Sequence, residues 1–322
     1  MIQCFLTMPD GTHLIEHPER GCWVNVVNPT EDESRWLIDT LHIEPEFVRS
    51  ALDDEERSHA DYDDDSRQAL IIIDCPFIEE AHEAEDRTIV QYDTHPLSFI
   101  FLPEHDCIVT ISMKEDNDTI RAFSAGKVRQ MNTRHRTKLL LQMLLHISKR
   151  YIACLRSIDR QFAANEKILR RSMNNSELIK MLGFEKSLVY FSSSLKSVES
   201  TIVRISSGRV VRMYEEDHDL LDDVLIEIRQ ATEMCSISAS LLNGTMDTFS
   251  SIISNNLNLT IRTLTIITLV FAIPTIIFSF YGMNVEDLPG ATIGHSWLIP
   301  FATSMVLCIG AAIFLFKSRF LK

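Results

Sequence analysis

Oxygen-bearing side chains gather in one short stretch of the sequence, between two long apolar runs. The stretch FSFYGMNVEDLPG, residues 278–290, offers the amide of Asn284 and the carboxylates of Glu286 and Asp287. Amide, carbonyl and carboxylate oxygens are the ligands that hard cations such as Mg²⁺ prefer. Because the sequence has no phosphate-binding glycine motif and no nucleophile–base arrangement, we expect cation binding here and no enzyme activity.

The two flanking runs are long enough to cross a membrane. They cover residues 264–281 and 297–316, with no lysine or arginine inside them or between them. A hydrocarbon core of ~30 Å requires about 20 apolar residues in a helix. One such run could be the buried helix of a soluble protein, but two in succession predict a membrane hairpin. We expect spans at about 263–282 and 297–316, in a membrane region that covers residues 259–322.

Basic residues flank this hairpin on one side only. Arg262 precedes the first run, whereas Lys317, Arg319 and Lys322 follow the second. The loop between the runs carries only acidic charges. The positive-inside rule therefore predicts that both termini are cytoplasmic and that the loop lies outside.

The composition restricts the partners of the chain. Its net charge of −14 leaves no basic surplus to neutralise phosphates, which argues against a nucleic-acid partner. The seven cysteines are scattered without a CxxC pair, which predicts reduced thiols in a cytosolic compartment. The start of the chain has no basic region and too short an apolar run for a signal peptide. We therefore expect the N-terminal part to stay in the cytoplasm.

The first 130 residues mix short strand-like runs with helical pieces. This mixture predicts a cytoplasmic α/β or α+β domain over residues 1–130. Within it, TEDESRWLIDTL is expected to form a helix with Thr30 as the N-cap and Glu33 completing a capping box. The strand candidates are CWVNVV (22–27), QALIIID (68–74), LSFIFL (97–102) and CIVTIS (107–112).

Residues 131–258 show long helical patterns and form a predicted helical stalk. We expect helices at about 134–170 and 176–205, and a third that runs from about 209 to 281 without a strong breaker. Apolar residues recur in it every seven positions, at Leu221, Ile228, Cys235, Leu242 and Phe249. This coiled-coil-like stripe is explained either by packing against the two preceding helices or by self-association, which we favour near the membrane.

One face of the first predicted span is narrow, small and polar. At about 100° per residue, an arc of roughly 120° holds one set of residues. They are Asn258, Ile261, Thr265, Thr268, Ala272, Thr275, Ser279 and Gly282. Close helix–helix packing is one explanation for such a face in a membrane. The other is a water-filled pore lined by several copies of the helix, since one copy cannot enclose a pore.

The order of these features resembles the CorA-type magnesium channels, a family of two-span metal ion transporters with a GMN motif. The resemblance rests on Tyr281-Gly282-Met283-Asn284 at the end of the penultimate span, on the acidic loop after it and on the basic tail. It implies an α+β chain assembled as a homopentamer in the lipid bilayer of a bacterial inner membrane, with the first spans around the axis. It implies Mg²⁺ as cargo and as regulator, and no organic cofactor.

The resemblance also implies roles for single residues. The implied selectivity filter is Gly282, Met283 and Asn284. Glu286 and Asp287 would raise the local cation concentration at the outer mouth. The implied pore-lining residues are Asn258, Leu264, Ala272, Thr275 and Ser279. Leu264 would form an apolar constriction. The implied basic collar of the cytoplasmic mouth is Arg262, Lys317, Arg319 and Lys322. The chain departs from the family in having Ala272 where methionine is frequent and Ser279 where glycine is usual.

A regulatory Mg²⁺ site is implied in the cytoplasmic part. In the family, an aspartate of the stalk helix faces an aspartate in the neighbouring subunit's α/β domain. Asp223 matches the stalk position, whereas the partner position falls near Ser50, so Asp53 or Asp54 would have to supply the carboxylate. These two aspartates begin an acidic stretch, residues 53–65, which a solvated surface would explain equally well.

The expected function is passive, potential-driven uptake of hydrated Mg²⁺, with Co²⁺ or Ni²⁺ as further cargo, gated by cytoplasmic Mg²⁺. One alternative is transport of Zn²⁺, as in the related zinc-transporting branch, although that branch usually varies the residue that is Met283 here. The other alternative is a membrane-anchored coiled-coil sensor or scaffold that conducts no ions.

Overall fold

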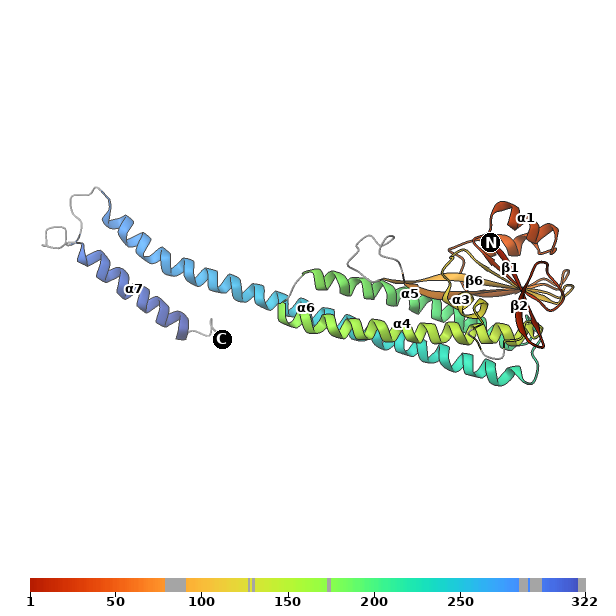
Figure 1. The fold of residues 1–322 in the computed structure, drawn as a ribbon. Helices are drawn as coiled ribbons and strands as arrows, with labels where there is room; N and C mark the ends of the chain where they lie inside the picture. Colours follow the sequence, from red (N-terminus) through yellow and green to blue (C-terminus); the bar gives the residue numbers. More distant parts are fainter. Residues whose placement is uncertain are drawn as a thin grey trace. The chain divides into compact units, whose positions relative to one another are not determined.

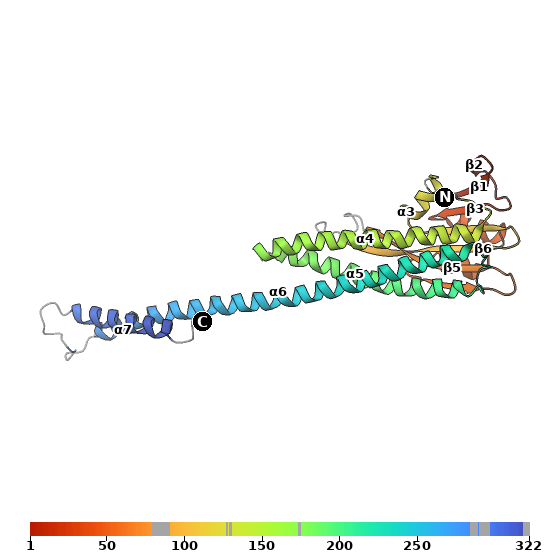
Figure 2. The same ribbon diagram turned by 90° about the horizontal axis from the view of Figure 1, so that it is seen from below.

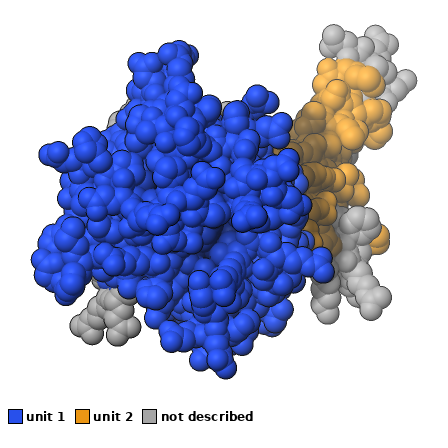
Figure 3. Space-filling view, turned by 90° about the vertical axis from the view of Figure 1, so that its right-hand side faces the viewer, with its two compact units in different colours: residues 1–243 blue, residues 244–322 orange. Residues whose placement is uncertain are grey.

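The computed structural model describes residues 1–78, 91–126, 128, 131–172, 175–283, 289 and 297–317. It divides into two compact units, residues 1–243 and residues 244–322 (Figure 3). The first unit holds a mixed β-sheet and long helices, and the second holds two apolar helical segments. The α+β fold expected from the sequence is therefore confirmed, with the sheet domain ahead of the long helices.

The first unit is built on a sheet, seen nearly edge-on in Figure 1. The sheet has seven strands in the order β2-β1-β3-β7-β6-β5-β4. The strands are β1 (Ile2–Met8), β2 (Gly11–Ile15), β3 (Trp23–Val27), β4 (His59–Tyr62), β5 (Ala69–Ile78), β6 (Tyr92–Leu102) and β7 (Cys107–Ser112). Only β3 and β7 pair in parallel among these strands, with Trp23 opposite Ile108. The central strands are apolar on both faces, which is typical of a sheet covered on both sides.

Two short helices cover one face of this sheet. The helices α1 (Glu31–Asp39) and α2 (Pro45–Ala51) place Leu37 and Phe47 in a core with apolar residues of the strands, including Val24. The predicted capping box of α1 is present, because the Thr30 hydroxyl accepts from the Glu33 amide at 3.3 Å and the Glu33 carboxylate accepts from the Thr30 amide at 2.9 Å.

Three further helices, α3 (Asp118–Ser124), α4 (Arg136–Ser172) and α5 (Asn175–Ser206), belong to the same unit, and Figures 1 and 2 show α4 and α5 running along the sheet. The hydroxyl of Tyr151 in α4 donates to the carbonyl oxygen of Asp74 in β5 at 2.9 Å. At the start of α3, the Asn117 side-chain oxygen accepts from the amides of Thr119 and Ile120 and so caps the helix.

The helix α6 (Asp217–Tyr281) begins in the first unit and continues into the second. In its first part, Leu221, Ile228 and Cys235 are buried, and the Cys235 thiol donates to the Leu188 carbonyl of α5 at 3.4 Å. The Ser238 hydroxyl donates to the Asp159 carboxylate of α4 at 2.6 Å. Within this unit, the seven-residue stripe therefore packs against the preceding helices, the first of the two explanations considered above.

The second unit contains the remainder of α6 and α7 (Leu298–Lys317). Among the described residues, α6 alone is long and apolar enough to cross a membrane, and Leu298–Ala311 is a shorter apolar stretch. The two predicted spans fall on the end of α6 and on α7, which lie side by side in both ribbon views (Figures 1 and 2).

Candidate functional site

The surface that α7 covers on α6 is a single stripe. Its residues are half-buried, whereas most of their neighbours along the helix are exposed. They are Arg262, Ile266, Val270, Ile273, Pro274, Ile277 and Tyr281. Their spacing of three and four places them on one side of the helix. The Cys308 thiol of α7 donates to the Val270 carbonyl oxygen of this stripe at 3.7 Å.

The facing side of α7 is lined by small residues. Pro300 and Ser304 are buried, and Cys308 and Ala311 are half-buried. Their spacing of four, four and three again marks one side of a helix. Small residues at a membrane helix interface allow the backbones to approach closely. The close packing between the two apolar helices therefore uses the small side of α7 and not the small side of α6.

The small polar face of α6 predicted from the sequence lies away from α7. At about 100° per residue, its centre is roughly 160° from the centre of the stripe that α7 covers. Its members are exposed except for Ala272, which is half-buried. Large apolar residues such as Phe271 (70% exposed) and Ile276 (68% exposed) lie on its flanks. Packing against α7 therefore does not explain this face, and the explanations left are packing between copies and a pore.

Three threonine hydroxyls of this face donate to the backbone of their own helix. Thr265, Thr268 and Thr275 each donate to the carbonyl oxygen four residues earlier, at 2.8 Å in every case. A hydroxyl has one hydrogen to donate and two lone pairs that accept. With the hydrogen used inside the helix, each threonine offers acceptor oxygen at the surface. Such a face is suited to groups that donate hydrogen bonds, and the water shell of a cation is one of them.

The helix α6 ends at Tyr281, and the next residue, Gly282, still donates to carbonyl oxygens of the last turn. Its amide donates to the carbonyl oxygens of Phe278 at 2.9 Å and Ser279 at 3.2 Å, and the Met283 amide donates to Phe280 at 3.4 Å. A Cβ atom on Gly282 would lie 3.1 Å from the Phe278 oxygen, which is tighter than ordinary contact. A side chain at this position would therefore crowd the Phe278 carbonyl, whereas the backbone of Gly282 is not in the left-handed conformation.

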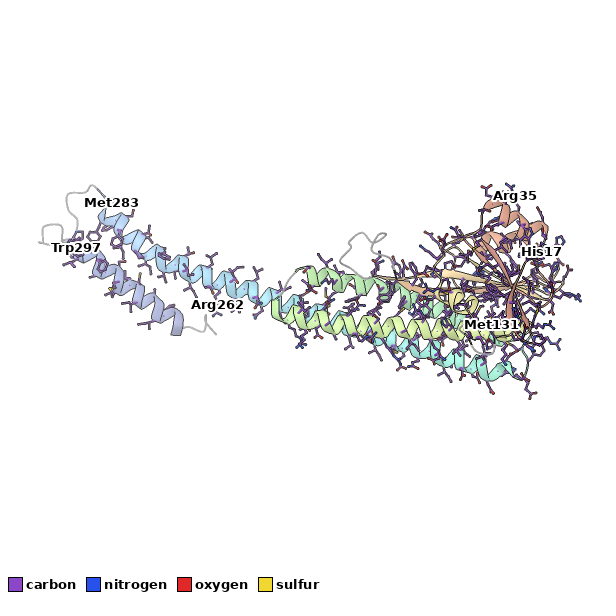
Figure 4. The ribbon with its side chains drawn as sticks, viewed as in Figure 1. His17, Arg35, Met131, Arg262, Met283 and Trp297 are labelled. Carbon is purple, nitrogen blue, oxygen red and sulfur yellow. The ribbon has the colours of Figure 1, made fainter. Side chains whose placement is uncertain are left out.

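The other predicted filter residue, Asn284, and the acidic Glu286 and Asp287 lie outside the described residues, as do Arg319 and Lys322. Figure 4 shows Met283 at the end of α6 and Trp297 at the start of α7, within the second unit. Arg262 lies in α6 on the side that α7 covers, and Lys317 is the last residue of α7.

At the inner part of the predicted pore face, Asn258 and Leu264 are both exposed, Leu264 to 63%. Along the helix, the amide of Asn258 and the apolar side chain of Leu264 therefore precede the hydroxyl-bearing residues of this face.

The predicted regulatory aspartates all lie at the surface. Asp223 is exposed on α6, and Asp53 and Asp54 are exposed after α2. The Asp53 carboxylate accepts from the Glu55 amide at 2.9 Å. In the described part of the chain, no three His, Cys, Asp or Glu side chains are grouped to hold a metal ion.

One contact of this region was not anticipated from the sequence. Pro274 has no amide hydrogen, so the Val270 carbonyl has no donor four residues later. The Cys308 thiol lies on this carbonyl. A proline inside an apolar run was the available signal, but which group would satisfy the freed oxygen depends on how α7 packs.

Comparisons with known proteins agree with this architecture. A family model described as CorA-like Mg²⁺ transporter protein matches residues 18–318. Over 296 residues the chain is 25% identical to the cobalt/magnesium transport protein CorA of Methanocaldococcus jannaschii, which covers 92% of this chain and 90% of that protein.

Solved structures show the same fold. The complete structure of the CorA magnesium transporter from M. jannaschii aligns with a TM-score of 0.80 at 21% identity, covering 99% of this chain and 98% of that one. The full-length CmaX protein aligns with a TM-score of 0.70 at 15% identity, covering 98% and 94%. Because the family model covers most of the sheet domain from residue 18, the long helices and both apolar segments, this protein belongs to the CorA-like Mg²⁺ transporter family, whose members are membrane transporters of divalent metal ions and not enzymes.

Proposed function

We propose that five copies of this chain surround a water-filled pore through which hydrated Mg²⁺ enters the cytoplasm, with Co²⁺ or Ni²⁺ as further cargo. The observation that carries the proposal is the placement of the small polar face of α6 on the side opposite α7. That face is free to line an axis, while the apolar flanks are free to meet neighbouring copies and lipid. The printed name of the M. jannaschii relative, a cobalt/magnesium transport protein, supports the choice of cargo.

The cargo would pass with its water shell in place. Mg²⁺ gives up water reluctantly and favours octahedral oxygen coordination. The waters around it donate hydrogen bonds outward, and the threonine oxygens of the face accept them. A ring of Asn284 amides at the outer end would hold the hydrated ion before entry. Glu286 and Asp287 would concentrate cations there.

The membrane potential supplies the driving force in this proposal. A divalent ion that crosses 100 mV toward a negative interior gains about 4.6 kcal/mol, twice the value for a single charge. Leu264 would act as the apolar constriction, because a ring of apolar side chains stops conduction by dewetting. Asn258 would form the polar ring on its cytoplasmic side, next to the basic collar of Arg262 and the C-terminal tail.

Regulation would take place between copies. Asp223 of one copy and Asp53 or Asp54 of the next would share an internal Mg²⁺ ion that holds the pore shut. If Asp223→Lys leaves the Mg²⁺ dependence of protease protection unchanged, Asp223 has no part in regulation.

Flux into proteoliposomes tests the proposal. Vesicles that contain a Mg²⁺-sensitive dye and the purified full-length protein are given an inside-negative potential, and the initial rate of influx is measured. Thr275→Leu fills the small face with an apolar side chain, and we expect about a tenfold loss of rate, or roughly 1.4 kcal/mol. Asn284→Ala should lower uptake at the outer mouth. Thr263→Leu is the matched control, since Thr263 makes the same 2.8 Å bond to its own helix but lies on another side.

Three results would contradict the proposal. Equal rates for Thr275→Leu, Thr263→Leu and the parent chain would mean that this face does not line a pore. No influx of any divalent ion from the parent chain would favour the sensor or scaffold. Influx of Zn²⁺ alone would favour the zinc-transporting branch. Native mass spectrometry in detergent supplies the copy number, for which we expect five.

A further inference from the structure

Two cysteines from distant parts of the sequence lie side by side in the sheet domain. Cys22 directly precedes β3 and Cys107 begins β7, and these strands pair in parallel with Trp23 opposite Ile108. Cys22 and Cys107 are the next pair outward in this register. Their sulfur atoms are 3.1 Å apart, and both side chains are fully buried. No other two cysteines in the described part of the chain have sulfur atoms in contact.

The backbone around this pair satisfies the requirements of a disulfide bond. Neighbouring strands lie about 4.8 Å apart. The Cα atoms of a disulfide are usually 4.4–6.8 Å apart, so paired strands already supply the separation. Both side chains point into the core beneath α1 and α2, where Cys22, Cys107 and Val24 belong to one apolar cluster. The two sulfurs are 3.1 Å apart, so about 1 Å of approach separates them from the length of a disulfide bond.

We propose that Cys22 and Cys107 form a reversible intramolecular disulfide when the protein meets a hydroperoxide. The site is a modification site of the cytoplasmic domain, separate from the proposed pore. It stands on the contact between two thiols whose residues are 85 positions apart in the chain.

The two thiols are not equivalent, which gives the reaction a direction. Either sulfur can donate in this contact; with Cys22 as the donor, the bond lowers the pKa of Cys107, aided by backbone amides and by the positive charge of Arg136. The same bond and burial raise the pKa of Cys22. The carbonyl oxygens of Glu19 and His105, at 3.2 and 3.1 Å, accept from the Cys107 thiol when it is protonated. The thiolate is the nucleophile in thiol chemistry, so Cys107 reacts first.

The reaction is balanced with hydrogen peroxide as the oxidant. The Cys107 thiolate attacks one peroxide oxygen, the O–O bond breaks, and the released hydroxide takes a proton to become water. Cys107 is then a sulfenic acid. Cys22 loses its proton, its sulfur attacks the Cys107 sulfur, and the hydroxyl group leaves with that proton as a second water. Two thiols and one peroxide thus give one disulfide and two waters, with two electrons passing from the sulfurs to the peroxide.

The pair lies beneath a corner where the sheet meets the start of α4. Gly21 has a φ of +82°, and a Cβ atom there would lie 3.0 Å from the Arg134 side chain. Arg136 of α4 makes an ion pair with Asp106 at 2.7 Å and donates to the Leu102 carbonyl at 3.3 Å. Because both sulfurs are buried, the proposed reaction requires local opening of the chain around them to admit peroxide.

Peptide mapping of the full-length protein in detergent tests the proposal without any substitution. After mild treatment with peroxide, we expect a non-reduced digest in which one peptide pair joins Cys22 to Cys107, with a mass two hydrogens below the sum of the two reduced peptides. Maleimide labelling under denaturation should find two fewer thiols than the seven of the untreated chain. Dithiothreitol should restore all of them. Sulfoxide at the exposed Met8 shows that the oxidant was active.

Two variants separate the roles of the two sulfurs. In Cys22→Ala the reaction should be slower, because the bond that lowers the pKa of Cys107 is lost, and it should stop at a Cys107 sulfenic acid, which a dimedone adduct reports. Cys235→Ser removes another buried thiol and should leave the disulfide intact. The proposal is overturned if all seven thiols survive while Met8 is oxidised, or if the mapped bond joins Cys107 to Cys4 or to a second copy.

Discussion

The Cys308 thiol lies 3.7 Å from the Val270 carbonyl oxygen, the one acceptor in this part of α6 that Pro274 leaves without a backbone donor. In the hydrocarbon part of a bilayer no water can replace a missing donor, so a neighbouring helix has to supply one. The proline in α6 and the cysteine in α7 are thus two parts of one interaction.

This relationship predicts a coupling between two substitutions. Cys308→Ala should lower the thermal stability of the purified protein by about 0.6 kcal/mol, the average for side-chain hydrogen bonds between membrane helices. In a Pro274→Ala background the Val270 carbonyl regains a backbone donor, so Cys308→Ala should then have little effect. A double-mutant cycle measured by thermal unfolding in detergent gives the coupling. Additive effects would mean that the thiol does not serve this carbonyl.

The glycine at the end of α6 predicts a defect in transport. In Gly282→Ala the added Cβ meets the Phe278 oxygen at 3.1 Å, so the end of the helix must shift. We expect about a tenfold loss of Mg²⁺ influx in proteoliposomes, since a displaced filter raises the barrier by roughly 1.4 kcal/mol. Gly310→Ala is the control, because nothing lies within 4 Å of a Cβ at that position of α7. Equal influx from the two variants would mean that Gly282 is not part of the selectivity filter.

A buried histidine predicts that acid destabilises the sheet domain. The Asn117 oxygen is occupied by the cap of α3, so its amide nitrogen donates to His95 Nε2 at 2.8 Å, and this bond requires a neutral ring. Burial, and then the charge of Lys114, lowers the pKa of His95 to about 4. The unfolded chain, with a pKa of about 6.5, binds the proton earlier.

Stability from His95 is therefore complete above about pH 6.5 and is lost as the pH falls toward 4. We expect the melting temperature to decline over this window in the parent chain and to decline less in His95→Gln. A residual slope is expected from His146, whose pKa is also lowered by burial. The exposed His13 provides the control substitution. An unchanged slope in His95→Gln would contradict this account.

Two isoleucines in the first part of α6 distinguish core packing from self-association. Ile228 is fully buried and Ile226 is 62% exposed. Ile228→Ala should cost about 2–5 kcal/mol of unfolding free energy, as is usual for truncation in a core. Ile226→Ala should cost little in an isolated chain. If Ile226→Ala lowers the copy number seen by native mass spectrometry, this side of α6 packs against another copy.

Local signals in the sequence predict many elements correctly. The Thr30 and Glu33 capping box is present as expected, and the four predicted strands fall on β3, β5, β6 and β7. β1 is not among the predicted strands. The apolar start of the chain is as short as a strand, but its length alone does not predict one. Pairing with β3 in the sheet makes it a strand, and such pairing depends on residues far along the chain.

The predicted start of the long helix is too early. The helical pattern extends back to residue 209, whereas α6 begins at Asp217. Gly208, just before this segment, has a φ of +69°, and within the segment Val210 and Val211 are buried, so residues 209–216 pack on the domain instead of forming the start of the helix. The burial of these two adjacent valines depends on the surrounding structure. It could not be predicted from the spacing of apolar residues along the sequence.

The candidate site, too, could be predicted from the sequence only in part. Helical periodicity is enough to place Thr265, Thr268 and Thr275 on one face of the helix. Which face α7 covers could not be predicted, since both apolar helices carry small residues that are suited to close packing. The side chains of Pro300 and Ser304 decide it by facing α6.

The back-bonded threonines have a consequence for ions of the opposite sign. Chloride or phosphate would need hydrogens directed at it, and those of Thr265, Thr268 and Thr275 are already committed to their own helix. If this face lines the proposed pore, the orientation of these hydroxyl dipoles would disfavour anions without any fixed charge on the threonines. The sequence of this face carries no carboxylate between residues 258 and 282, so a divalent ion in such a pore would meet none there.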